Sequence, residues 1–557
     1  MAVIITDHRT IINEADAVTG WTGASALFTA DPDPVEATGS IGTTVSTATA
    51  DAYFTTTAQN LSDALVYVWV QPNGTMDTLT NGGTGIHLGD GTNRISFHVT
   101  GSDASGFAHA SGPVRWTCAV IDTTSLPILS TVRAGSLANL NLSAITQIGA
   151  TYKTLSKALG GASNCFTDII RVGLPANNDG AMLTVTGGTS GAPGKFLEMV
   201  AEDRSTANQR AYGIIREIGS GLFSCQGALR FGNATGTDSS WFEESNTILV
   251  FENRGFATTR YKIVIRDNGT GTTTFKLGNK VGTGTAATGE SGCNIIVPGG
   301  VGGEFDAQTD TNVTDVFLYG TTFSGFSNGF KMKSGQEFIG SQLTQSGTFI
   351  PSGALVYNST VTNSTAVAAV EVSSVAEVDV IVNSTFSGNN RAIRITAAGT
   401  YTFDNLSFAN NTNDIENAST GLVTINATNG SNVATFINTN GGTTVINNAV
   451  TFRVGNIREG SEIRIFRQSD LVELAGAETV GTVPEGLNNV SVDADPDNPG
   501  LFRVSYTYNY SADLPVFIVA HNLEYIWLRI PVTLTAQPGS IQIFQQEDRQ
   551  YDFGSTP

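Results

Sequence analysis

The sequence has 557 residues, of which 14% are charged and 40% are hydrophobic, and its formal net charge is −20. The hydrophobic fraction suffices for large buried cores and excludes a disordered chain. The negative charge argues against proteins that neutralise nucleic-acid phosphates or bind anionic membranes. No segment approaches the run of about 18 apolar residues that a transmembrane helix needs. We therefore expect several folded domains, no nucleic-acid partner and no membrane insertion.

The first part of the chain, residues 1–195, is predicted to be a β-sandwich of the concanavalin or jelly-roll type. Segments 64–70, 94–98 and 114–121 alternate in hydrophobicity and are separated by turns rich in Gly, Asn and Asp. This spacing is typical of short antiparallel strands that form a sandwich.

Such a sandwich could bind a sugar. The aromatic candidates are Trp69 and Trp116, and Asp90 and Asn93 are possible polar partners. Both tryptophans lie within alternating strands, which favours a place in the core, and fold alone does not assign the function.

The histidines and cysteines give no pattern of a metal or cofactor site. None of the five histidines has a partner at the spacing that zinc requires. A tight turn at 90–91 would set His87 opposite Arg94. The four cysteines lie 47, 60 and 68 residues apart, which is neither a disulfide framework nor a metal motif. We expect free thiols in strands, no metal and no cofactor.

Residues 196–455 are predicted to form a parallel β-helix. In the later part of this region a small polar pair precedes an apolar residue repeatedly, as at 320–323, 358–361 and 383–386. Periods of about 20 residues are typical of stacked units that cannot bury their apolar faces alone. We expect Asn and Thr to stack in ladders along the axis. The apolar anchors, which recur every 18 to 25 residues, are Phe323, Leu343, Val361, Phe386 and Phe408.

The earlier coils of the predicted β-helix are less regular. A short helix at 201–204 would cover the open end of the stack, as terminal coils need a polar cover. The segment 282–289 is rich in Gly and Thr and is expected to be a loop on one face.

Residues 456–557 are predicted to form a small antiparallel sandwich. Segments 462–466 and 502–508 alternate in hydrophobicity, and segment 515–520 is an entirely apolar strand. This apolar strand indicates that the C-terminal domain makes contacts between subunits. The whole chain is therefore expected to be all-β.

One cluster could carry glycoside hydrolysis, which needs two carboxylates about 5 to 9.5 Å apart across a sugar. Asp238, Glu243 and Glu244 lie within seven residues of one another, and Trp241 among them could stack on a sugar ring. The alternative, which we favour, is a solvated loop anchored by one buried tryptophan. Partners across a β-helix groove come from adjacent coils, so closeness in sequence is a poor guide.

A second acidic group could bind Ca²⁺ with help from carbonyl oxygens. Asp306, Asp310 and Asp315 lie in a stretch rich in Gly and Thr, but the Asp-x-Asp-x-Asp spacing of a calcium loop is absent. We expect exposed turn acids.

Several short motifs resemble structural proteins of marine and cyanobacterial tailed phages. They are residues 216–219 with 225–232 at the start of the predicted β-helix, and 460–466, 521–525 and 545–549 in the last domain. The resemblance implies a virion protein with a concanavalin-like sandwich and a right-handed β-helix, assembled as a homotrimer. It does not distinguish the capsid from the tail.

We therefore expect a non-enzymatic structural protein on the surface of a phage particle: a capsid decoration, a spike or a tail fibre. The first residues lack the basic and apolar regions of a signal peptide, which predicts assembly in the host cytoplasm with other capsid or tail proteins. The alternative is a tailspike or receptor-binding protein that binds or hydrolyses a host surface polysaccharide. In that case the substitutions Glu243→Gln and Glu244→Gln would abolish cleavage without changing the fold. A bacterial surface adhesin is a third possibility, against which the missing signal counts.

Overall fold

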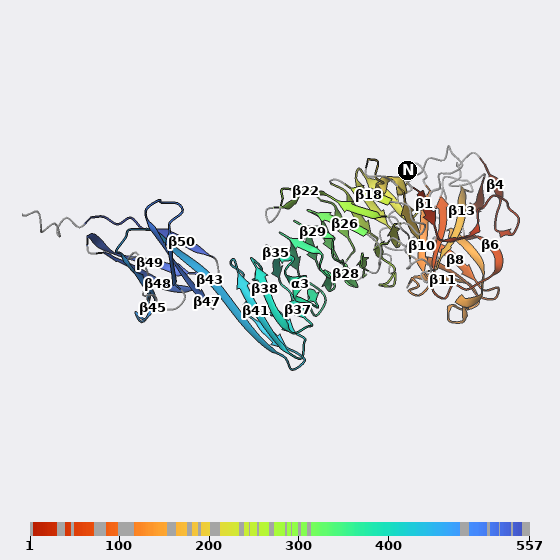
Figure 1. Ribbon diagram of the computed structural model, residues 1–557. Helices are drawn as coiled ribbons and strands as arrows, with labels where there is room; N and C mark the ends of the chain where they lie inside the picture. The colour runs from red at the N-terminus through yellow and green to blue at the C-terminus, as the bar shows by residue number, and fades with distance from the viewer. Residues whose placement is uncertain are drawn as a thin grey trace, which may run out of the picture. The chain divides into compact units, whose positions relative to one another are not determined.

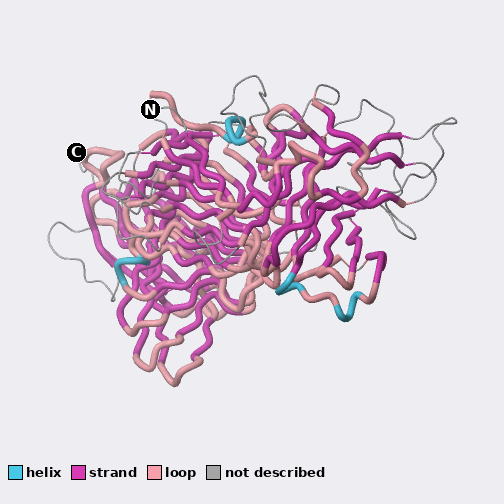
Figure 2. The backbone as a smooth tube through the Cα atoms, turned by 90° about the vertical axis from the view of Figure 1, so that its right-hand side faces the viewer, coloured by secondary structure: helices cyan, strands magenta, loops and turns pink. Residues whose placement is uncertain are grey.

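The computed structural model is almost entirely β-structure, and the helices among its described residues are single turns (Figures 1 and 2). It forms two compact units, residues 1–354 with 364–366, and residues 355–363 with 367–557. The helical turns are η1 (Leu137–Asn139), η2 (Leu142–Ala144), α2 (Phe196–Met199) and α3 (Val375–Val378). The structure describes residues 4–29, 39–45, 49–71, 85–98, 116–127, 129–152, 163–174, 181–187, 191–200, 212–232, 239–243, 246–252, 256–266, 272–283, 287–290, 292–298, 302–308, 314–478, 490–509, 513–522, 524–535 and 538–547.

The first unit opens with the expected β-sandwich, two antiparallel sheets that enclose one apolar core. One sheet has the order β10-β7-β13-β5-β4, with β2 also on β13, and the other has the order β11-β9-β8-β12-β6-β3. The core between them is built of alternating aliphatic side chains such as Val66, Val68, Ile86 and Ile148. The strands of the first sheet are β2 (Thr10–Asn13), β4 (Ala26–Phe28), β5 (Ser40–Val45), β7 (Leu65–Gln71), β10 (Thr117–Asp122) and β13 (Ser163–Gly173). Those of the second are β3 (Trp21–Thr22), β6 (Ala50–Gln59), β8 (Gly85–Gly89), β9 (Arg94–His98), β11 (Ser130–Ala134) and β12 (Ile145–Tyr152).

The hairpin β8–β9 corrects one prediction. His87 lies opposite Ser96, and Arg94 lies opposite Gly89. The connection therefore spans residues 90–93 and is longer than a two-residue turn. The ring of His87 stacks on Tyr53 at 4.6 Å, and burial lowers the pKa of this histidine to about 4.

The four cysteines are free and buried, as expected. Three of them lie in the strands β10, β13 and β16, and Cys293 directly precedes β24.

The β-helix begins earlier than predicted, within the same unit. Its first strand, β14 (Leu183–Thr186), pairs in parallel with β17, and β1 (Ile4–Asp7) covers β14 as an antiparallel neighbour. The predicted cap at 201–204 lies outside the described residues, and α2 ends just before it. The remaining strands of this sheet are β17 (Leu229–Phe231), β20 (Lys262–Ile265), β25 (Glu304–Asp306), β28 (Gly329–Lys331) and β31 (Phe349–Ile350).

Two further sheets complete the described coils of this unit, so each coil is a turn of three short strands (Figure 1). The second sheet contains β15 (Ile215–Gly219), β16 (Leu222–Cys225), β19 (Ile248–Phe251), β24 (Asn294–Ile296), β27 (Thr322–Ser324) and β30 (Gln342–Thr344). The third contains β18 (Ser239–Glu243), β21 (Thr273–Leu277), β26 (Thr314–Tyr319) and β29 (Glu337–Ile339). The expected loop at 282–289 joins a small hairpin, β22 (Asn279–Val281) and β23 (Thr288–Glu290), and its residues 284–286 lie outside the described residues.

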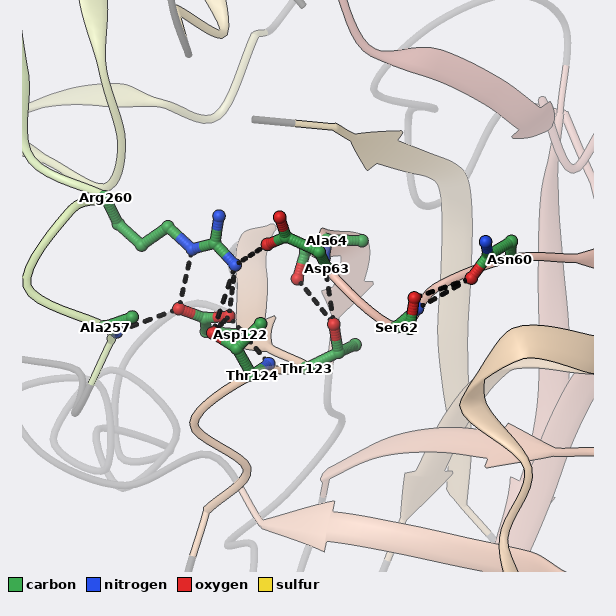
Figure 3. Close-up of polar contacts among 9 residues, drawn as sticks. All are labelled: Asn60, Ser62, Asp63, Ala64, Asp122, Thr123, Thr124, Ala257 and Arg260. Atoms are coloured by element: carbon green, nitrogen blue, oxygen red, sulfur yellow. Dashed lines mark hydrogen bonds and ion pairs between the residues drawn. The ribbon is translucent and has the colours of Figure 1, made fainter. Parts of the chain in front are cut away.

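A buried ion pair fastens the sandwich to these coils (Figure 3). Nε and Nη2 of Arg260 donate to the two carboxylate oxygens of Asp122 at 2.8 and 2.9 Å, and Asp63 adds a second acid at 2.5 Å. Burial of Asp122 opposes its ionisation, but the Arg260 guanidinium holds the pKa of this carboxyl below its ordinary value. A buried charge without its partner is strongly destabilising. Replacing either Arg260 or Asp122 would therefore weaken the contact between the sandwich and the coils.

The second unit continues with coils of the same kind. Its ladders contain β34 (Val370–Val372), β37 (Arg391–Ile395), β40 (Asn413–Asn417) and β42 (Phe436–Asn438); then β33 (Thr360–Thr362), β36 (Thr385–Ser387) and β39 (Ser407–Ala409); then β32 (Leu355–Tyr357), β35 (Ile381–Val382), β38 (Gly399–Asp404), β41 (Leu422–Thr428) and β43 (Thr443–Ile457).

The short sequence repeat corresponds to one corner of the coil. Asn383 has φ 53°, the left-handed conformation that turns the chain, and the next residue, Ser384, is buried. The Ser384 hydroxyl accepts from the backbone N–H of Ser359 one coil away, at 3.3 Å. The following apolar anchor enters the core, where Val361 pairs with Phe386 and Phe386 with Phe408. Each copy of the repeat therefore supplies a residue that turns the corner, a buried hydroxyl that bonds to the neighbouring coil, and an apolar anchor in the core.

The C-terminal sandwich shares a strand with the coils. Residues 443–448 of β43 pair in parallel with β41, and residues 449–457 pair antiparallel with β47, so the predicted boundary at 455/456 falls inside β43. Two sheets, β43-β47-β46 with β50 and β45-β44-β48-β49, enclose a second apolar core. The new strands are β44 (Glu462–Arg467), β45 (Glu473–Glu478), β46 (Val490–Ala494), β47 (Phe502–Asn509), β48 (Leu514–Asn522), β49 (Tyr525–Leu534) and β50 (Gly539–Gln542).

Candidate functional site

The predicted aromatic platform lies inside the β-helix core. Alternation along β18 turns Trp241 inward, where its indole is 3% exposed. Its ring lies 5.6 Å from Phe196 of α2 and 5.0 Å from Phe231 of β17, measured between ring centroids. An indole enclosed in this way presents no face on which a sugar could stack. Two of the predicted acids, Asp238 and Glu244, lie outside the described residues.

Glu243, the third predicted acid, points inward as well. It is 5% exposed and accepts hydrogen bonds from the backbone N–H of Phe196 and, at 3.3 Å, from the hydroxyl of Thr247. Burial raises the pKa of this carboxyl to about 7, although the two hydrogen bonds oppose that rise. Through the hydrogen bond to Phe196, Glu243 fixes the start of α2 against the coil.

The opposite face of the same sheet carries a row of half-buried side chains that we call the outer column: Phe242, Lys276, Phe317 and Glu337. These four residues are in register on β18, β21, β26 and β29. Neighbouring members are therefore about 4.8 Å apart along the axis of the stack. The Lys276 ammonium lies 5.2 Å from the centroid of the Phe242 ring and donates to Oδ1 of Asn279 at 2.9 Å. The outer column alternates between aromatic and charged groups.

Beside the last two members of the outer column lies a small polar network. The Tyr319 ring stacks on Phe317 with 6.0 Å between centroids, and its hydroxyl donates to Oε2 of Glu337 at 2.7 Å. Lys280 donates to the same oxygen at 2.9 Å. Burial and this carboxylate both raise the pKa of Tyr319 well above its ordinary value. The phenol therefore remains a donor, and Glu337 is held in one orientation.

The hairpin β22–β23 flanks the outer column and supplies Lys280. Its backbone packs directly on the corners of the next coils, because glycines meet there: a Cβ at Gly289 would lie 1.8 Å from the backbone nitrogen of Gly320. A Cβ on Gly340 would likewise lie 2.4 Å from the backbone nitrogen of Gly289. These close contacts fix the hairpin as one edge of the face.

Sequence reasoning missed the outer column. Alternation from Trp241 would have placed Phe242 on the opposite face, which was an available signal. The other members lie 34, 41 and 20 residues apart, and those unequal intervals hide the register of the coils.

The sandwich residues considered for sugar binding lie in the structure of the domain itself. Trp69 is 6% exposed, while Trp116 is half-buried next to β10. The Asp90 carboxylate accepts from the backbone N–H groups of Asn93, at 2.7 Å, and Asn141, at 2.9 Å. Partial burial opposes ionisation, but these bonds hold the pKa of Asp90 below its ordinary value. Asp90 therefore organises the loop between β8 and β9.

The acids considered for calcium do not come together among the described residues. Asp306 is largely buried and pairs with Arg266 at 3.3 Å, and Asp315 is half-buried on β26. Asp310 lies outside the described residues. Within the described ranges no group of three acid, histidine or cysteine side chains could hold a metal ion, and no helix is long and apolar enough to cross a membrane.

A second surface feature lies on the outer side of the sheet β45-β44-β48-β49. Trp527 on β49 is 66% exposed, and the Arg529 guanidinium lies 3.6 Å from the centroid of the Phe517 ring. We call this surface the C-terminal apolar face. It surrounds a shallow hollow lined by Phe466, Leu471, Phe517, Val519, Trp527 and Arg529.

Comparisons with known proteins give the chain no family. No family model and no curated protein matches it. Among solved structures, one match is described as "Crystal structure of Agl-KA catalytic domain"; it is 9% identical, covers 79% of this chain and 98% of that chain, and has a TM-score of 0.17. A match at that TM-score carries no inference about the fold or function of this chain.

Proposed function

We propose that the chain is a non-enzymatic structural protein of a tailed-phage virion, carried on the particle surface and assembled with copies of itself. The observation that carries the proposal is the C-terminal apolar face. Exposed apolar patches rimmed by polar residues mark protein contacts, and the exposed Trp527 that lines the hollow is the type of residue that dominates such contacts.

The architecture also favours a durable particle component. Its coils join hydroxyl and amide ladders across successive strands, as in the bond from the Asn405 amide to Oδ1 of Asn383 at 2.9 Å. Such a stack leaves strand edges exposed only at its ends, where natural proteins need protection. The short motifs similar to phage structural proteins point the same way.

The alternative of a polysaccharide hydrolase has less support at the predicted position. Trp241 and Glu243 are core residues, and the other two predicted acids, Asp238 and Glu244, lie outside the described residues.

The proposal is tested on purified phage particles from the genome that encodes the chain. We expect mass spectrometry to find the chain in intact particles, and proteases added to those particles to release its peptides, since it lies on the surface. Particles that lack the chain would contradict the proposal.

Self-association is tested separately by mass photometry of the purified full chain. The substitution Trp527→Glu places a charge in the apolar contact and should convert a homotrimer into monomers, whereas Ile4→Glu, at another exposed apolar position, should leave the mass unchanged. A wild-type chain that is monomeric at micromolar concentration would remove the C-terminal apolar face as a contact between copies.

A further inference from the structure

The outer column presents the chemistry of a carbohydrate-binding surface. Phe242 and Phe317 are half-buried aromatic residues on the outside of the sheet, two coils apart. Two strand spacings separate them, about 10 Å along the stack. Aromatic faces carry partial negative charge and attract the C–H bonds on one side of a sugar ring. Two such rings in line suit a linear chain of sugars.

Polar groups lie between and beside the rings, where they can bind hydroxyl groups. Lys276 lies between Phe242 and Phe317 in the register, and Asn279 holds its ammonium in place. Glu337 follows Phe317 and is oriented by Tyr319 and Lys280. Ligand sites of this kind combine apolar platforms with a few well-placed polar groups.

The charges of this face favour a neutral ligand. Lys276 on β21 and Lys280 on β22 are matched by Asp315 on β26 and Glu337 on β29, and Glu290 on β23 adds a third acid. The whole chain carries −20, so a polyanion gains nothing from its long-range field. The Glu337 carboxylate keeps lone pairs that can accept from hydroxyl groups, and the ammonium groups of Lys276 and Lys280 keep N–H bonds that can donate to them. Neutral sugars have hydroxyl groups in abundance.

We infer that the outer column binds a neutral oligosaccharide, with Phe242 and Phe317 as stacking platforms and Lys276 and Glu337 as hydrogen-bonding groups. The ligand runs parallel to the axis of the stack, across β18, β21, β26 and β29. The hairpin β22–β23 forms one edge of the site and supplies Lys280. This inference goes beyond the virion proposal and does not depend on it.

The test is binding of the purified full chain to immobilised bacterial surface polysaccharides of defined repeat, half of them neutral and half containing uronic acids. We expect binding to neutral repeats that is insensitive to salt, since no net charge is neutralised. Isothermal titration calorimetry with the corresponding oligosaccharide then gives the affinity. Binding only to uronate-containing repeats, or to none of the set, would overturn the inference.

Variants connect that binding to the outer column. Phe317→Ala is expected to weaken affinity at least tenfold. Phe317→Leu keeps the apolar packing, removes the aromatic face and should show the same loss with an unchanged thermal midpoint. Phe436→Ala, at an exposed aromatic on another sheet, is the matched control and should bind as the wild type does. Equal affinity of Phe317→Leu and the wild type would exclude this site.

Lys276→Gln examines the polar part of the site. The amide keeps a donor but loses the charge, so we expect a loss of three- to tenfold that is the same at low and high salt. Lys262→Gln, at a lysine paired with Glu304 on another sheet, should have no effect. A loss at Lys276 that disappears at high salt would mean that the ligand is an anion.

Discussion

The coils of the first unit and those of the second have the same geometry but differ in what holds their neighbours together. In the first unit, aromatic rings contact one another from coil to coil, with 4.8 Å between Phe231 and Phe275 and 4.4 Å between Phe305 and Phe330. In the second unit, ring contacts between phenylalanines among the described residues are confined to the group of Phe386, Phe403 and Phe408. Amide ladders take a larger share there.

The corners differ in the same way. At this corner the first unit has Asn246 in an early coil but Gly320 and Gly340 later, where the hairpin backbone comes too close for any side chain. The second unit uses asparagine, as at Asn358, Asn383 and Asn405. Asparagine tolerates this conformation and adds a side-chain hydrogen bond. At this corner glycine therefore occupies the positions that meet the hairpin backbone, and asparagine occupies positions that do not.

The largest expected effect comes from breaking the aromatic contacts of the first unit. Phe330 is fully buried and has five ring neighbours, among them Phe323 and Phe349. Phe330→Ala should lower the free energy of unfolding by about 3–5 kcal/mol. Phe408→Ala in the second unit, with fewer ring contacts, should cost less. Urea denaturation with hydrogen exchange of the adjacent coils measures both, and equal losses would remove the distinction between the units.

The next effect is pH dependence from Glu243. Its folded pKa of about 7 lies above the unfolded value, so its share of stability is fully present below about pH 4.3 and is lost as pH rises through 7. The loss amounts to roughly 3 kcal/mol. Glu243→Gln keeps the acceptor for Phe196 and should flatten the stability profile between pH 5 and pH 8, relative to the wild type. An identical profile in the variant would show that this carboxyl is not the titrating group.

A smaller effect is expected from the hydroxyl ladder of the second unit. Ser384→Ala removes the hydroxyl that accepts from the N–H of Ser359, at 3.3 Å, and donates to the Val382 carbonyl, at 2.9 Å. A buried unsatisfied group costs about 1–3 kcal/mol. Thr402→Ala, at an exposed position, should stay within about 0.5 kcal/mol of the wild type. A Ser384 variant as stable as this control would mean that the ladder contributes nothing.

The smallest effect tests the corners. Asn383→Gly removes the acceptor of the Asn405 amide and should cost about 0.5–1 kcal/mol. Asn383→Ala additionally places a Cβ in the left-handed conformation, which costs roughly 1–2 kcal/mol more. Thermal unfolding ranks the two variants. If alanine were tolerated as well as glycine, backbone conformation would not explain the choice of residue.

The sequence allowed the fold to be predicted because its signals are local. Strand alternation identified the sandwiches, and the repeat at 358–361 and 383–386 marked real corners with buried hydroxyls. The boundaries were harder, since β14 already belongs to the first ladder of the β-helix and β43 is shared between the coils and the C-terminal sandwich. The acid cluster was misleading because Trp241 and Glu243 are close in sequence but lie on the inner side of β18. Finding the outer column required the register between coils, which depends on insertions of unequal length.

Cryo-electron microscopy of the intact particle tests the central proposal most directly. We expect density for three copies of this chain related by a threefold axis on the outer surface, joined through the C-terminal apolar face, at either capsid-lattice or tail positions. A particle whose density accounts for every surface protein without this chain would contradict the structural role.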